Sequence, residues 1–141
     1  MTRKPRKITP ERLATSKTED GEQAALFCHA YEMAKTNIRW DFLFAIPNGG
    51  KRGVATASRL VATGVKRGIP DICLPLPINR FHGLYIELKK LAALSATNGG
   101  VDDAQKFWHA RLREQGYAVS VCYGWVHAAD VIERYLQGVL K

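Results

Sequence analysis

The chain has 141 residues, of which 46% are hydrophobic, and its 21 Lys and Arg residues against 13 Asp and Glu give a formal net charge of +8. This is the size of one domain with a real core. No apolar run is long enough to span a bilayer and the N-terminal residues lack the apolar segment of a signal peptide, so we expect a cytoplasmic protein away from membranes. The positive charge favours a nucleic-acid partner, although ribosomal and other structural RNA binders share it.

The three cysteines are far apart and flanked by apolar residues: Cys28, Cys73 and Cys122. The absence of a CxxC pair or a Cys/His cluster argues against zinc. We therefore predict reduced core cysteines. The histidines are scattered, and each is interpreted as a surface or helix-face residue: His29, His82, His109 and His127.

Residues 1–17 are rich in Lys and Arg and contain two prolines, which predicts a basic, mostly disordered arm. It is either a solvated tail or a nucleic-acid contact. The folded domain is then expected over residues 18–141, with a first helix that begins at the N-cap candidate Thr18.

Further elements follow in chain order. Phe42 to Ile46 is a strand candidate, ended by the turn "PNGGKRG", and "VATASRLVATG" reads as a short helix. Two strands are expected within "RGIPDICLPLPINRFHGLYIELKK", and "ALSATNGG" after them is a loop.

The last third of the chain is predicted to be helix, strand and helix. "VDDAQKFWHARLREQG" is an amphipathic helix capped by Asp102 and stopped by Gly116; "YAVSVCYG" is a strand, and "WVHAADVIERYLQGVL" is a closing helix. The resulting order α-β-α-β-β-α-β-α predicts an α/β fold: a central mixed sheet of about four strands flanked by helices.

Two carboxylates stand at the ends of the paired strand candidates. Asp71 follows Pro70, which stiffens the backbone that enters the strand. In the next strand Glu87 and Lys89 share a face, because side chains alternate along a strand. A hairpin with a long connection would bring Asp71 and Glu87 together.

Two close carboxylates repel each other, and a divalent cation resolves the conflict. Mg²⁺ takes one or two carboxylates as ligands, activates water and neutralises phosphate charge. A lysine such as Lys89 can orient the attacking water. The alternative is that Asp71 is a turn residue and that Glu87 and Lys89 form a surface ion pair.

These residues carry a resemblance. Pro70-Asp71 with Glu87-Leu88-Lys89 resembles the signature of PD-(D/E)XK nucleases, whose restriction-endonuclease-like fold has a mixed sheet flanked by helices. Together with "IPNGGKRG", "GVKRGIPDICLPLP", "HGLYIELKK", "AQKFWHARLREQGYAVSVCYGW" and "VIERYL", the chain is similar to the VRR-NUC family over roughly residues 19–137. The stand-alone form of this domain is typical of phage and bacterial proteins.

The resemblance implies roles for individual residues. Asp71, Glu87 and the carbonyl of Leu88 would hold Mg²⁺, which Mn²⁺ could replace, and Lys89 would be the catalytic lysine. A glutamine of the family matches Gln105, although Asp102-x-x-Gln105 also fits a capping box.

The family's glutamate on the first helix matches either Glu19 or Glu22. Glu19 is the closer match because Gln23 follows it with the E-x-x-x-Q spacing, while Glu22 lies on the same side of the helix. For either residue the alternative is a favourable interaction with the helix dipole.

Several basic residues precede Asp71 and are candidates for phosphate contacts, with a solvated basic face as the alternative: Lys51, Arg52, Arg59, Lys66 and Arg67. The segment "LAALSATNGGV" after Glu87-Leu88-Lys89 is longer than the usual pattern, which puts substrate specificity in doubt.

The resemblance implies a metal-dependent, structure-selective DNA endonuclease without a small-molecule cofactor, acting on branched DNA such as four-way junctions. Alternatives are a non-catalytic nucleic-acid-binding module and a restriction-type enzyme. Two symmetric cuts would suit a homodimer, and the apolar closing helix is a candidate interface, unless it simply packs on its own sheet.

Overall fold

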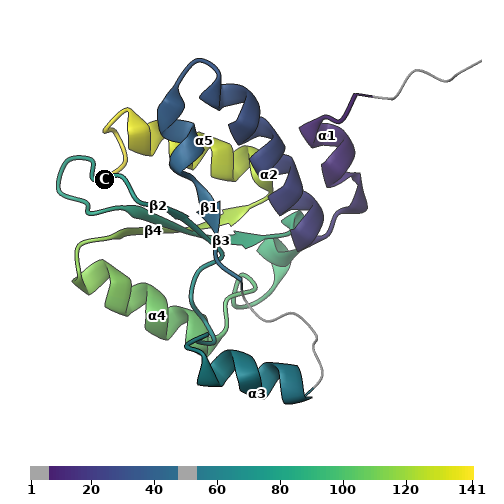
Figure 1. Cartoon of the computed structure of the whole chain (residues 1–141), viewed down its shortest axis with the longest axis vertical. Helices are drawn as coiled ribbons and strands as arrows, with labels where there is room; N and C mark the ends of the chain where they lie inside the picture. Colours follow the sequence, from purple (N-terminus) through teal and green to yellow (C-terminus); the bar gives the residue numbers. More distant parts are fainter. Residues whose placement is uncertain (1–6, 48–53) are drawn as a thin grey trace, which may run out of the picture.

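The computed structural model describes residues 7–47 and 54–141, and its centre is one four-stranded sheet of order β1-β2-β3-β4 (Figure 1). The strands are β1 (Phe44–Ala45), β2 (Ile72–Leu74), β3 (Leu84–Lys89) and β4 (Ala118–Tyr123). β2 pairs antiparallel with both β1 and β3, whereas β3 and β4 are parallel. The predicted mixed sheet is therefore confirmed.

Helices cover both faces of this sheet. They are α1 (Pro10–Leu13), α2 (Glu19–Ala34), α3 (Val54–Ala62), α4 (Asp103–Glu114) and α5 (Trp125–Leu136), with short 3-10 helices η1 (Ala14–Ser16), η2 (Ile38–Phe42) and η3 (Leu91–Ser95). In Figure 1, α2 and α5 lie together on one face, α4 lies on the other, and α3 is set off beyond the start of α4. None of the described helices is long and apolar enough to cross a membrane.

The helix ends follow their sequence signals. Thr18 caps α2, since its hydroxyl accepts a hydrogen bond from the Gly21 N–H at 3.0 Å. Asp102 and Gln105 form a complete capping box at the start of α4. After α4, Gly116 has φ +89°, a left-handed conformation that glycine adopts readily at the end of a helix.

The structure differs from two expectations about local structure. Within the arm predicted over residues 1–17, residues 10–16 are helical, because Thr9 caps α1 and Pro10 occupies its first turn. The strand expected over residues 42–46 is limited to Phe44–Ala45, since the segment before it winds into η2 and buries Trp40. Residues 1–6 and most of the turn "PNGGKRG" lie outside the described residues.

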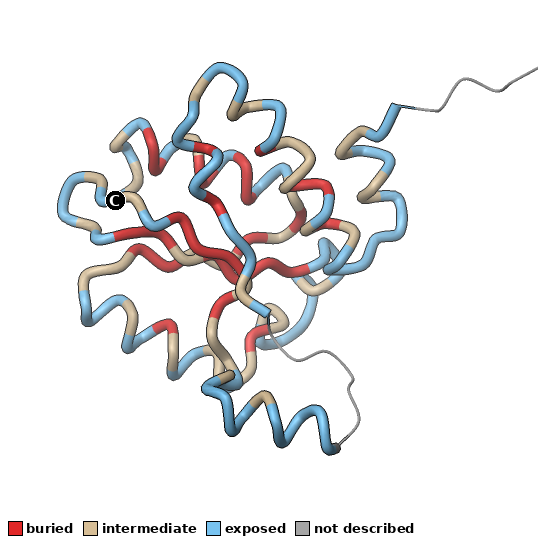
Figure 2. Tube along the Cα trace, viewed as in Figure 1, coloured by how far each residue is buried: buried red, intermediate tan, exposed pale blue. Residues whose placement is uncertain are grey.

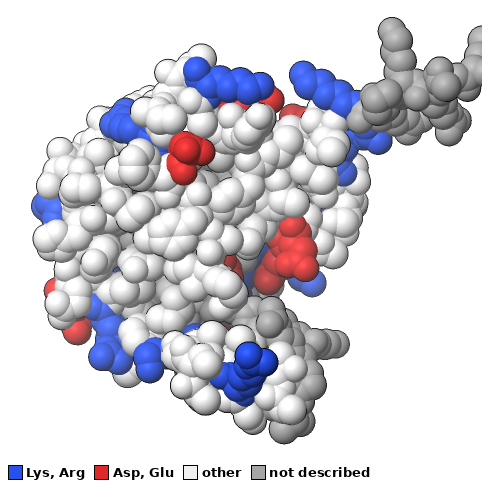
Figure 3. Space-filling view, viewed as in Figure 1, with Lys and Arg blue, Asp and Glu red and all other residues white. Residues whose placement is uncertain are grey.

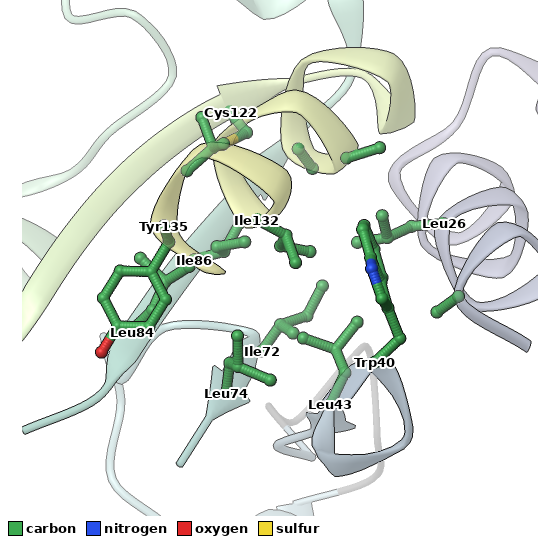
Figure 4. Close-up of a cluster of buried hydrophobic side chains, with 14 of the residues drawn as sticks. Leu26, Trp40, Leu43, Ile72, Leu74, Leu84, Ile86, Cys122, Ile132 and Tyr135 are labelled. Atoms are coloured by element: carbon green, nitrogen blue, oxygen red, sulfur yellow. The ribbon is translucent and has the colours of Figure 1, made fainter. Parts of the chain in front are cut away.

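The hydrophobic core lies between the sheet and the pair α2 and α5 (Figures 2 and 4). Leu84, Ile86 and Leu88 of β3 are in this core, whereas Glu87 and Lys89 of the same strand point to the other face. The alternation predicted for this strand is thus confirmed, and it leaves the α4 face of the sheet available for polar groups.

The closing helix α5 uses its apolar face inside the protein. Its buried residues are Ala128, Ala129, Val131, Ile132, Tyr135 and Leu136. Trp125 and Leu140 also pack against the core, while Val126 is exposed. The interpretation that this helix has surplus apolar surface for an interface is therefore wrong, and the alternative that it packs on its own sheet holds.

The cysteines give a test of the core. All three are free thiols; Cys73 and Cys122 are buried, and Cys28 is half-buried. Burial raises the pKa of Cys122 to about 12 and also raises the pKa of Cys73. A raised thiol pKa means less reactive thiolate at pH 8.

We expect iodoacetamide at pH 8 to alkylate Cys28 first, and the other two cysteines only after unfolding, as followed by mass spectrometry. Labelling of Cys122 at the rate of Cys28 in the folded protein would contradict this packing.

Candidate active site

The β2–β3 hairpin brings the two acidic residues of the sequence motif to one place. Ile72 lies opposite Ile86, and continuing this register by one residue sets Asp71 opposite Glu87. The Asp71 carboxylate oxygen Oδ2 accepts a hydrogen bond from the Leu88 N–H at 2.8 Å. Its backbone carbonyl accepts one from the Ile46 N–H at 2.7 Å. One hydrogen bond to its side chain and one to its backbone therefore fix the position of Asp71.

A close backbone approach places Gly68 against the start of α4. Gly68 has φ +92°, and a Cβ on it would lie 2.5 Å from the Ala104 carbonyl carbon and 2.9 Å from the Gln105 nitrogen. Only glycine therefore fits without displacing backbone. Pro70 then leads the chain from this contact into β2, so the first turn of α4 and the start of β2 border the same space.

The carboxylate of Glu87, a residue that is 1% exposed, is contacted by three side chains: those of Gln105, Lys89 and His109. Gln105 donates a hydrogen bond from Nε2 to Glu87 Oε1 at 2.8 Å. Lys89 Nζ lies 3.4 Å from the same oxygen and donates to Gln105 Oε1 at 3.4 Å. Because Gln105 Oε1 also accepts from the Asp102 N–H, Gln105 serves the capping box and the cluster together.

His109 belongs to this cluster and was missed at the level of sequence. Its Nε2 lies 3.5 Å from Glu87 Oε2. Of the two expectations for this histidine, a surface or a helix-face residue, the second holds, because His109 is buried on the inner side of α4. The available signal was spacing: His109 follows Gln105 by four residues and therefore shares its helix side.

The segment after β3 packs on the lysine. A Cβ at Gly100 would lie 3.5 Å from Lys89 Cδ and 3.0 Å from Ala93 Cβ. Tyr123 donates a hydrogen bond from its hydroxyl to the Gly99 carbonyl at 2.7 Å. The unusually long segment therefore covers the aliphatic stem of Lys89, which is only 6% exposed.

A cleft of about 650 Å³ opens over these residues. Its walls are the first turns of α2, the apolar side of α3 and the segment before Asp71; its floor includes Asp71, Glu87, Leu88, Lys89 and Gln105. Figure 3 shows the molecule hollowed between the upper body and the region of α3, with acidic side chains at the upper rim.

The two glutamate candidates separate clearly. Glu19 lines the cleft together with Asp20 and Gln23. Glu22 is buried elsewhere, where its Oε2 accepts a hydrogen bond from the Trp125 N–H at 2.8 Å and so stabilises the start of α5. The residue with the E-x-x-x-Q spacing is thus the one at the cleft.

The basic candidates are divided as well. Lys66 and Arg67 are exposed and line the cleft, and Arg67 lies 3.8 Å from Asp102. Arg59 is exposed on α3 but does not line it. Lys51 and Arg52 lie outside the described residues.

The residues present fit a divalent cation with oxygen ligands. The site does not consist of side chains alone: within residues 7–47 and 54–141, no group of three or more His, Cys, Asp or Glu side chains could hold a metal ion. Two carboxylates and the Leu88 carbonyl, which points to the Asp71 side because the Leu88 N–H does, suit Mg²⁺ with bound waters. In the described part of the chain, Glu87 Oε2 is buried and has no hydrogen-bond partner. Such an atom needs a cation or a donor.

Two comparisons with known proteins give a match. The family model of the VRR-NUC domain matches residues 15–125. The chain belongs to the VRR-NUC family. A solved structure described as a VRR_NUC domain protein is 26% identical, with a TM-score of 0.67 over 88% of this chain and 96% of that chain. The comparison with curated proteins gives no match.

The family and the fold expected from the sequence are both confirmed. The chain carries a VRR-NUC nuclease-family domain, and its four-stranded mixed sheet flanked by helices is the PD-(D/E)XK-like fold. A nuclease-family domain implies binding of nucleic acid.

The different positions of Glu19 and Glu22 can be tested by stability. We expect Glu22→Ala to lower the free energy of unfolding by about 2 kcal/mol, because it removes a buried acceptor from the start of α5. Glu19→Ala should cost less than about 1 kcal/mol, since Glu19 is exposed and contributes only through the helix dipole. Urea unfolding of both variants measures the difference; equal losses would contradict the placement of Glu22.

Proposed function

We propose that this VRR-NUC protein is a metal-dependent endonuclease that hydrolyses phosphodiester bonds of branched DNA. The observation that carries the proposal is the meeting of Asp71, Glu87 and the buried Lys89 on the floor of one cleft. A surface that only bound nucleic acid would gain nothing from carboxylates facing phosphates, which argues against a non-catalytic module.

In this proposal Asp71, Glu87 and the Leu88 carbonyl hold Mg²⁺ or Mn²⁺. The ion supplies charge neutralisation at the phosphate and favours ionisation of water. In the hydrolysis, the oxygen of a water would form a bond to phosphorus and lose its proton to solvent. The phosphorus–oxygen bond to the leaving nucleotide would break, and the leaving oxygen would take up a proton from solvent.

The position of Lys89 would allow it to assist this hydrolysis. Its ammonium group is held between Glu87 Oε1 and Gln105 Oε1, each 3.4 Å away. A cation fixed in this way can orient the attacking water and stabilise the charge that develops on the phosphate. Glu19 lines the same cleft and can hold a water molecule near the ion. Lys66 and Arg67 can contact phosphates of the DNA.

The chemistry is tested by cleavage of labelled DNA with Mg²⁺, with Mn²⁺ and with chelator. We expect cleavage in either metal and none in chelator, while Ca²⁺, larger and less demanding in geometry, supports binding with little cleavage. Asp71→Asn, Glu87→Gln and Lys89→Ala should each lower the rate by at least about 100-fold.

Matched controls lie next to these residues. Lys90→Ala and Asp103→Asn change exposed residues adjacent to the cluster and should cleave near the wild-type rate. Wild-type cleavage by Glu87→Gln, or full activity in chelator, would refute the proposed mechanism. DNA binding without cleavage by the unaltered protein in every metal would favour the non-catalytic module.

The proposed substrate and assembly are tested separately. We expect a homodimer that nicks a four-way junction in two symmetric strands, because one small domain has one cleft and a two-fold dimer gives two at a fixed spacing. Light scattering measures the assembly, and the nicking pattern on single-strand, duplex, flap and four-way DNA measures the preference. A monomer at micromolar concentration that prefers flaps would overturn this substrate and leave the nuclease proposal standing.

A further inference from the structure

We infer that His109 is a positioning residue that holds the metal-binding carboxylate of Glu87 through its second oxygen. This rests on the proposed function, in which Glu87 is a metal ligand. The starting observation is that Glu87 Oε2 and His109 Nε2 are both buried, lie 3.5 Å apart and, among the described residues, have no hydrogen-bond partner.

Each of these two buried atoms can supply the hydrogen-bond partner that the other lacks. A buried polar atom without a partner costs roughly 1–3 kcal/mol. An Nε2–H on the imidazole is a donor, and the carboxylate oxygen is an acceptor. A closer approach of a few tenths of an ångström would make this contact a hydrogen bond of ordinary length. The tautomer with the proton on Nε2 satisfies both atoms at once.

With this contact, both oxygens of the Glu87 carboxylate have a partner on α4. Oε1 accepts from Gln105 Nε2 at 2.8 Å, and Oε2 faces His109. Gln105 and His109 are four residues apart on α4, so successive turns of one helix present both donors. The carboxylate plane cannot turn without leaving one of these partners.

A simpler role as core filling does not account for this residue. Within α4, all of which the structure describes, only His109 is buried. A leucine or methionine there would bury apolar surface without the cost of a polar ring. The imidazole is instead directed at the Glu87 carboxylate, with Nε2 3.5 Å from Oε2.

Fixing a metal ligand through its other atoms is a general way to strengthen a site, and loss of such a partner typically lowers metal affinity or activity 10–100-fold. His109 would thus affect how tightly the cation binds and how fast the reaction proceeds. His109 is buried and does not line the cleft, so the KM for DNA should stay unchanged when Mn²⁺ is saturating.

The test compares His109→Gln with His109→Met, because these side chains have similar length and differ in the amide donor. Mn²⁺ affinity is measured without DNA by electron paramagnetic resonance of free Mn²⁺, and kcat and KM are measured on the cleaved substrate. His29→Met is the matched control, since His29 packs on Trp40 and Trp125 away from the cleft. If His109→Met does not fold, His109→Phe, which keeps a ring without a donor, takes its place.

We expect His109→Met to bind Mn²⁺ 10–100-fold more weakly and, at saturating Mn²⁺, to lose kcat at constant KM. His109→Gln should stay within about threefold of the unaltered protein, and His29→Met should match it. Equal affinities of the Gln and Met variants, whether both normal or both weak, would overturn the positioning role. If the unaltered protein binds no Mn²⁺, the proposed function fails and this inference fails with it; normal binding by every His109 variant removes the inference alone.

Discussion

A carboxylate inside the protein is the constraint on which the rest of this structure depends. Glu87 is 1% exposed, and an isolated buried charge of this kind is strongly destabilising. Its partners are an amide, an ammonium and an imidazole, contributed by Gln105, Lys89 and His109. Two of the three come from α4, so the position of this helix on the sheet is tied to the charge of one side chain on β3.

The two faces of the sheet therefore have separate tasks. Leu84, Ile86 and Leu88 direct one face of β3 into the apolar core under α2 and α5. The residues between them supply the polar cluster on the other. Since the core face is densely packed, β3 offers a rigid support, and a polar group on a rigid strand is held more accurately than one on a loop.

The parts of the site that depend on local sequence could be predicted. The alternation of "LYIELK" placed Glu87 and Lys89 on one face, and Asp102-x-x-Gln105 gave the capping box. Pro70-Asp71 and the strand register were also within reach. These features follow from period, capping chemistry and backbone stiffness, which act over a few residues.

What could not be predicted depends on contacts between distant segments. The sequence favoured Glu19 over Glu22 only through the spacing to Gln23, and it did not show that the Trp125 N–H of α5 lies against Glu22. His109 is an ordinary helix residue until α4 lies over β3. The helical turns of residues 10–16 and the burial of Trp40 in η2 likewise depend on packing that neither propensity nor periodicity encodes.

The charge of the cleft explains why a cation would be needed for the proposed reaction. The chain as a whole carries +8, yet the cleft collects the carboxylates of Glu19, Asp20, Asp71 and Glu87. A phosphate that approaches this floor is repelled unless a divalent ion neutralises it. Arg67 can help at the rim: its guanidinium is exposed and 3.8 Å from Asp102, an ion pair too solvated to be worth much. It can therefore exchange that contact for a phosphate at little cost. In this arrangement Lys66 and Arg67 would bring DNA to the cleft, and only the ion would let it reach the floor.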